Sequence, residues 1–123
     1  MLILRNVKKV KLGWSQQLEV RNLSEFFKGW FIGNFEPSML KSLDFEVAVK
    51  FFSKGELEPI HKQIIATEFT VVLSGEIEIN NSKFSQNQII RIDPGEAANF
   101  RALTDTTVLC IKTPSIASDK VLL

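Results

Sequence analysis

The feature that most constrains the fold is the regular return of turn signals along the chain. They recur about every 8–12 residues, which is the rhythm of an all-β sandwich or barrel. Short segments rich in β-branched, aromatic or alternating residues lie between them, as strands require. The sequence therefore predicts an all-β domain, whose turns fall at Gly55, Gly75, Asn80-Asn81, Asn87 and Pro94-Gly95.

The segment 45–52 shows the clearest strand pattern. Phe45, Val47, Val49 and Phe51 face one way, and Glu46, Ala48 and Lys50 face the other. Alternation alone leaves open which of these faces lines the interior. Upstream, the segment 23–28 predicts one short helical turn capped by Ser24, and 29–35 predicts a strand. The remaining strands are expected at 69–73, 76–79, 83–84, 88–92, 99–103 and 106–113.

Size and composition exclude several classes of protein. With 123 residues the chain is expected to form one domain, and a net charge of +1 favours neither nucleic acid nor an anionic membrane as a partner. No apolar run approaches the roughly 20 residues of a membrane span, and the first residues lack the features of a secretion signal. We therefore expect a cytoplasmic protein. Its single cysteine, Cys110, is expected to be a buried apolar side chain rather than a reactive thiol.

The functional signal lies between two of these turns. It runs Gly55, five residues, His61, one residue, Gln63, four residues, Glu68, six residues, Gly75, and it holds the only histidine of the chain. Residues two apart in a strand point to the same side, so His61 and Gln63 are expected to face one interior, with Glu68 returning on a neighbouring strand. Imidazole and carboxylate groups together suit iron, manganese, zinc or nickel.

This spacing resembles the first signature motif of the cupin family, in which a second histidine stands at the position of Gln63. The second cupin motif, registered on Gly95, is matched only at that glycine; Ala98 stands at the position of the family's last metal ligand. The resemblance implies a single cupin domain over residues 1–123, a double-stranded β-helix (jelly-roll) barrel. Its core is expected at about 45–113, N-terminal strands or an arm at 1–44, and a C-terminal surface tail at 114–123.

An intact cupin site, as the resemblance implies it, has three histidines and a glutamate. This chain retains His61 and Glu68, and the amide of Gln63 is a feeble third ligand. The expected cofactor is therefore none, or a weakly bound divalent transition metal held by His61, Gln63 and Glu68. Without a metal, His61 is a hydrogen-bonding residue, Gln63 a polar pocket residue, and Glu68 is paired with Lys50 or His61, because a buried carboxylate requires a partner.

Three functions follow from this site. The first is binding of a small polar molecule, a sugar or a carboxylate, with Lys50, Trp30 and Phe100 as further ligand-binding candidates beside His61, Gln63 and Glu68. Trp30 and Phe100 are alternatively core residues.

The second function is catalysis by His61 and Glu68, either metal-dependent (of the dioxygenase or of the sugar or carbon-acid isomerase type) or metal-free, with His61 as general base. The third is a structural role as an oligomer, most simply a homodimer. In that case the segment before Trp14 pairs with an edge of the second subunit.

Overall fold

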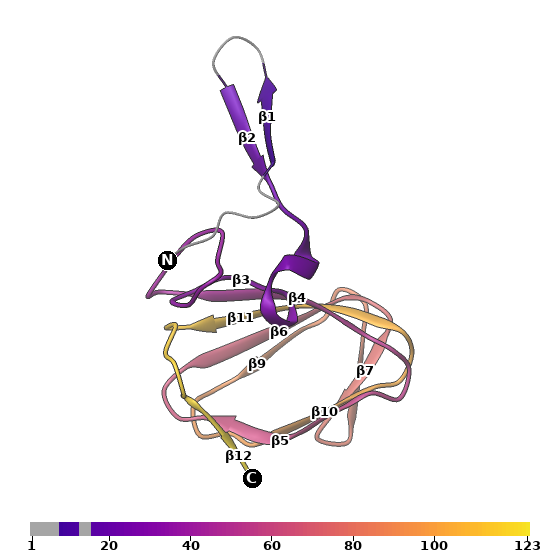
Figure 1. Ribbon diagram of the computed structural model, residues 1–123. Coiled ribbons are helices and arrows are strands. Elements are labelled where there is room, and N and C mark those ends of the chain that lie inside the picture. Colours follow the sequence, from indigo (N-terminus) through magenta and orange to yellow (C-terminus); the bar gives the residue numbers. More distant parts are fainter. Residues whose placement is uncertain (1–7, 13–15) are drawn as a thin grey trace.

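The computed structural model describes residues 8–12 and 16–123, with side chains from residue 18 onward. Figure 1 shows two five-stranded sheets facing each other as a flattened barrel, with every strand pair antiparallel. The all-β prediction is confirmed. One sheet has the order β12 (Lys120–Leu122), β5 (Leu57–Gln63), β10 (Ala98–Ala102), β7 (Glu76–Ile79) and β8 (Ser82–Ser85); the other has the order β3 (Trp30–Ile32), β4 (Glu46–Phe52), β11 (Thr106–Thr113), β6 (Thr67–Ser74) and β9 (Ile89–Ile92).

The tight turn between β7 and β8 forms where the two asparagines predicted it. Asn80 and Asn81 both have positive φ, at 50° and 66°. Asparagine tolerates this left-handed backbone better than most residues, and two such residues in succession suit the twist of a hairpin.

Strand β4 turns its less apolar face inward. Ala48 is fully buried, whereas Phe45 and Phe51 on the opposite face are 48% and 67% exposed. Phe52 shares the inner face and packs against Phe100, with ring centroids 4.5 Å apart. The face that carries Lys50 therefore lines the barrel, which settles the question left open by the alternation.

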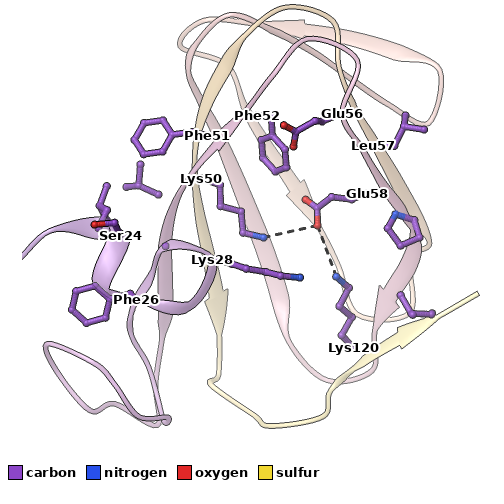
Figure 2. A pocket seen from close by; sticks show the side chains of 15 residues that line it. Ser24, Phe26, Lys28, Lys50, Phe51, Phe52, Glu56, Leu57, Glu58 and Lys120 are labelled. Atoms are coloured by element: carbon purple, nitrogen blue, oxygen red, sulfur yellow. Dashed lines mark ion pairs between the residues drawn. The ribbon is translucent and has the colours of Figure 1, made fainter. Parts of the chain in front are cut away.

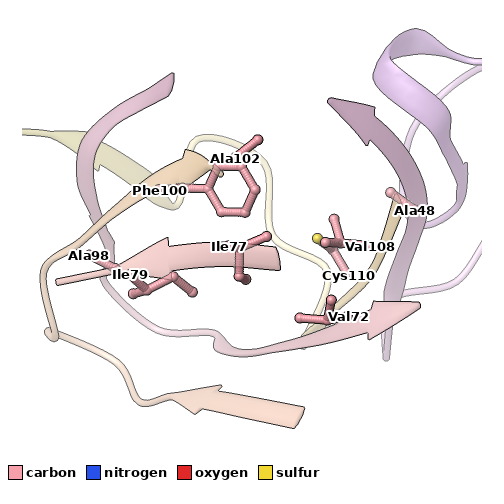
Figure 3. Close-up of a cluster of buried hydrophobic side chains, with 9 residues drawn as sticks. All are labelled: Ala48, Val72, Ile77, Ile79, Ala98, Phe100, Ala102, Val108 and Cys110. Carbon is pink, nitrogen blue, oxygen red and sulfur yellow. The ribbon is translucent and has the colours of Figure 1, made fainter. Parts of the chain in front are cut away.

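The hydrophobic core fills one part of the interior, between the two sheets (Figure 3). Its largest fully buried side chains are Ile77, Val72 and Val108. Each of these removes enough apolar surface from water to contribute about 1.5–3 kcal/mol. The whole cluster comprises Ala48, Val72, Ile77, Ile79, Ala98, Phe100, Ala102, Val108 and Cys110.

The segment before the barrel contains a hairpin and two 3₁₀ turns. β1 (Lys8–Leu12) pairs with β2 (Gln16–Val20) of the same chain, and the hairpin projects away from the barrel in Figure 1. The turns are η1 (Leu23–Glu25) and η2 (Phe27–Gly29). The prediction of Ser24 as the cap is wrong: Asn22 is the capping residue, and its N–H donates to Glu25 Oε2 at 2.7 Å.

The C-terminal segment contributes to the barrel. The sequence predicts a surface tail from 114, but β12 pairs with β5 at an edge of the first sheet. Asp119, directly before β12, is buried, and its carboxylate accepts the N–H groups of Ile65 and Ala66 at 2.9 Å. Asp119 therefore fixes the turn between β5 and β6. Over the described ranges, we find no helix long and apolar enough to cross a membrane.

Candidate functional site

The interior holds the histidine and the glutamate of the motif side by side. His61 on β5 is 9% exposed, and its Nε2 lies 3.9 Å from Oε2 of Glu68 on β6. His61 Nδ1 lies 3.0 Å from the carbonyl oxygen of Pro59. Because a carbonyl only accepts hydrogen bonds, Nδ1 must carry the proton and donate it to Pro59. Nε2 is thereby turned toward Glu68, at a distance longer than a hydrogen bond.

Glu68 stays ionised despite its burial. Burial by itself raises the pKa of this carboxyl group, but the imidazole of His61 and the ammonium groups of Lys112 and Lys50 outweigh it, so the net pKa is lowered. Both predicted partners, His61 and Lys50, thus stabilise the carboxylate, and Lys112 is a further partner that sequence reasoning missed.

A small inner cavity lies against these two residues. Its volume is about 20 Å³, and Thr70, Ala98 and Phe100 line it together with His61 and Glu68. A volume of this size accommodates about one water molecule. The inner cavity is therefore too small for an organic ligand unless neighbouring side chains move.

Gln63 is buried but not joined to this cluster. Its side chain is on β5, 2% exposed, and neither Oε1 nor Nε2 has a hydrogen-bond partner among the described residues. Gln63 is absent from the lining of the inner cavity. Of the three predicted site residues, His61 and Glu68 line the inner cavity and Gln63 does not.

The side chains around the inner cavity do not fit a tightly held transition metal. Ala98 pairs directly with His61 across β10 and β5, so a methyl group lies where the resemblance places the last ligand. Cys110 also lines the cavity, but burial raises the pKa of its thiol to about 11, which disfavours the thiolate that metals bind. The described residues contain no group of three histidine, cysteine, aspartate or glutamate side chains able to hold an ion.

A second, much larger cavity opens between β4, β5, β12 and the two 3₁₀ turns (Figure 2). We call it the outer cavity; its volume is about 810 Å³. Glu58 accepts two ion pairs in it, from Lys50 Nζ and from Lys120 Nζ, each at 3.9 Å from Oε2. Most of its remaining wall is apolar and includes Phe26, Val49, Phe51, Phe52, Leu57 and Leu122.

Glu58 connects the two cavities, because its side chain lines both. Sequence reasoning missed it, since Glu58 and His61 are three residues apart and simple alternation places them on opposite faces. The pairing of β5 with β10 shifts register between these residues: Ala98 is opposite His61, and Phe100 is opposite Glu58. This β-bulge lets both side chains face the interior.

The two aromatic candidates occupy different places. The ring of Trp30 lies between two lysines, with Lys50 Nζ 5.0 Å and Lys112 Nζ 4.9 Å from its centroid. These are cation–π distances. Phe100 is 7% exposed and belongs to the core while it lines the inner cavity. The ring of Trp30 therefore contacts the ammonium groups of Lys50 and Lys112, and Phe100 forms an apolar part of the inner cavity wall.

The two facing antiparallel sheets form a double-stranded β-helix, and solved structures with this fold match the chain. A conserved protein with a double-stranded β-helix domain from Klebsiella pneumoniae matches with a TM-score of 0.63 and 18% identity, over 84% of this chain and 89% of that one. YhhW from Escherichia coli matches with a TM-score of 0.63 and 22% identity, over 86% of this chain and 47% of the other.

An RmlC-like cupin from Desulfovibrio desulfuricans matches with a TM-score of 0.55 and 26% identity, over 61% of this chain and 76% of that one. The chain has the cupin fold, as its first motif predicts. No family model matches its sequence, and no curated protein matches it. Similar structures also include KdgF from a Halomonas species, with a TM-score of 0.56 and 16% identity, which shows a shared fold and assigns no ligand.

Proposed function

We propose that this chain is a metal-independent cupin that binds a small polar molecule, a sugar or a carboxylate, in the outer cavity. The observation that carries the proposal is an open cavity of about 810 Å³ with mostly apolar walls and the Lys50–Glu58–Lys120 ion pairs inside it. Few convergent polar groups in an apolar cavity of roughly 300–1,000 Å³ are typical of ligand sites. Trp30, beside Lys50, supports the charged part of this site.

The test is a thermal-shift screen of protein treated with a chelator, against sugars and carboxylates. A ligand that binds the folded chain raises its melting temperature with concentration. Ser24 lines the outer cavity, so Ser24→Trp should obstruct it and abolish the shift. Ser85→Trp, at an exposed position on β8, is the matched control and should retain the shift. No shift with any compound would refute binding.

A second candidate, metal-free acid–base catalysis, is supported by the orientation of one side chain. Since His61 Nδ1 donates to Pro59, Nε2 is the atom available to accept a proton, with Glu68 beside it to stabilise the imidazolium. The matching test is turnover by the chelator-treated protein with any ligand found in the screen. His61→Gln should abolish turnover while binding in the outer cavity persists; turnover in that variant would exclude His61 as the base.

We also propose that the chain forms a homodimer. Large apolar side chains are exposed on adjacent strands β5 and β12, including Ile60 at 41% and Val121 at 37%, and such surface is commonly covered by a partner. Light scattering after size exclusion tests this proposal, and a monomer at high concentration would refute it. A cytoplasmic location stays a prediction.

A further inference from the structure

The charges of the outer cavity are unequal, and this imbalance identifies the ligand more closely. Three lysines line the cavity, and Figure 2 shows the ammonium groups of Lys28, Lys50 and Lys120 pointing toward the same space. Glu58 is the carboxylate that pairs with two of them. The other acidic side chain of the lining, Glu56, instead accepts the N–H of Ser53 at 3.1 Å. Positive charge is therefore in excess around Glu58.

The two paired lysines have lost much of their contact with water. The side chain of Lys50 is 15% exposed and that of Lys120 is 37% exposed, yet they share one carboxylate. Burial lowers the pKa of Lys120, and the opposing effect of Glu58 does not restore it. A second anion at this place would supply the partner that one of the two cations lacks.

Lys28 is held over the same cavity by an unusual backbone. It has a left-handed conformation, φ 52° and ψ 29°, within η2. The next residue, Gly29, also has positive φ and presses against Val49 on β4: a Cβ atom there would lie 2.0 Å from the Val49 carbonyl oxygen. Non-glycine residues adopt this region at a cost and often do so at functional sites. Among the described carboxylates, none lies within ion-pair distance of Lys28.

The mostly apolar side chains that line the outer cavity favour an organic anion over a sugar as the ligand. Ser24 is the single hydroxyl side chain of the lining, whereas aromatic and aliphatic side chains from β4, β5 and the 3₁₀ turns supply most of the surface. A sugar needs many hydrogen-bonding partners around its ring, because each buried hydroxyl without one is costly. An apolar body with one charged end satisfies these walls and the lysines together.

We infer that the outer cavity binds a carboxylate with an apolar body, its carboxylate held by Lys50 and Lys120 beside Glu58 and its body against Phe52, which shares the inner face of β4 with Lys50. Lys28 closes over the charged end from η2. This inference rests on the proposed function and narrows its ligand from small polar molecules to amphiphilic carboxylates.

The test compares two probes of the same shape, phenylacetate and phenylacetamide, by nuclear magnetic resonance titration of the full chain. Charge-assisted contacts to lysine should make phenylacetate bind about tenfold or more tightly than the neutral amide. Lys50→Met and Lys120→Met should each lower the affinity for phenylacetate toward that for phenylacetamide. Lys62→Met is the matched control, because Lys62 is on β5, the strand that carries Glu58, but does not line the cavity.

The results distinguish the inference about charge from the underlying proposal that the cavity binds a small molecule. Equal affinity for both probes would overturn the charge inference and leave small-molecule binding intact, as would sugar binding in the absence of phenylacetate binding. No binding of any compound would overturn both. Lys28→Gln changes an exposed side chain, so it tests the charge inference even if the Lys50 variant does not fold; an unchanged affinity for phenylacetate in both Lys28→Gln and Lys120→Met would refute the lysine site.

Discussion

The most informative single substitution is Gln63→Met. The Gln63 side chain is 2% exposed, and both of its amide atoms lack hydrogen-bond partners among the described residues. A buried polar group without a partner costs about 1–3 kcal/mol. Methionine has a similar length and no group that needs a hydrogen bond, and flexible side chains adapt well to an existing space. We expect Gln63→Met to raise the free energy of unfolding by about 1–3 kcal/mol.

Urea unfolding measures this change. The midpoint should move up by about 1 M while the slope stays the same, since slopes of small domains are about 1–3 kcal/mol per M. Asp119→Ala is the contrasting control in the neighbouring turn, because its carboxylate accepts the N–H groups of Ile65 and Ala66. Hydrogen bonds to charged groups contribute about 1.5–3 kcal/mol each, so this variant should lose at least that much.

A destabilised Gln63→Met protein would refute the reasoning. It would mean that the amide of Gln63 is paired in solution, through water or a bound molecule, and that its apparent isolation is incorrect. A stabilised variant that no longer binds ligand would instead identify Gln63 as a residue kept for binding at a cost in stability.

Three further predictions concern the fold around the site. Gly29→Ala should lower the free energy of unfolding by about 2–4 kcal/mol, because the new methyl group meets the Val49 carbonyl. Gly55→Ala, also at positive φ but with nothing within 4 Å, should lower it by about 1–2 kcal/mol. Equal losses in urea unfolding would contradict the packing of η2 on β4. The lowered pKa of Glu68 stabilises the folded protein at pH values above the pKa of an unfolded glutamate, near 4.3, and this stabilisation is lost as the pH falls through the folded pKa. The free energy of unfolding of Glu68→Gln should therefore fall less steeply between about pH 5 and 3. A pH profile identical to that of the unsubstituted protein would refute this. Cys110 should react with iodoacetamide far more slowly in the native protein at pH 8 than after unfolding, because it is buried and its pKa is raised to about 11; equal rates would be inconsistent with that burial.

The barrel could be predicted from local patterns because its strands and turns are determined by nearby residues. Asn80 and Asn81 adopt the backbone expected of them, and the motif from Gly55 to Gly75 was sufficient to predict the cupin fold. The contribution of 114–123 to the first sheet was not predictable, because the contacts of Asp119 with Ile65 and Ala66 join residues 54 and 53 positions apart.

The outer cavity was hidden for a related reason. Its charged centre depends on the β-bulge that turns Glu58 inward, and alternation along a single strand does not reveal a bulge. Lys120 reaches Glu58 only because β12 pairs with β5. Of the site predicted from sequence, His61 and Glu68 come together as expected, and Lys50 lies close enough to lower the pKa of Glu68 while its ion pair is with Glu58.

The lysines also help to explain how a barrel interior with few metal ligands keeps the Glu68 carboxylate ionised. At an intact metal site of the kind that the first motif resembles, a bound cation would stabilise the glutamate. Here the imidazole of His61, followed by Lys112 and Lys50, lowers the pKa of Glu68 against the effect of burial, and Lys50 and Lys120 pair with Glu58. The lysine side chains thus supply the positive charge of the interior, and this charge would oppose the binding of a metal cation.

This argument has a direct measurement. Mass-spectrometric metal analysis of tag-free protein should find well below one equivalent of iron, manganese, zinc or nickel, because His61 and Glu68 are two strong donors where a closed site needs about four. Introducing a donor with Ala98→His, opposite His61 in the register, should raise the metal content, and adding Lys50→Met should raise it further by removing a repelling charge. Stoichiometric metal in the unmodified protein, lost in His61→Ala, would refute both the donor count and the role given to the lysines.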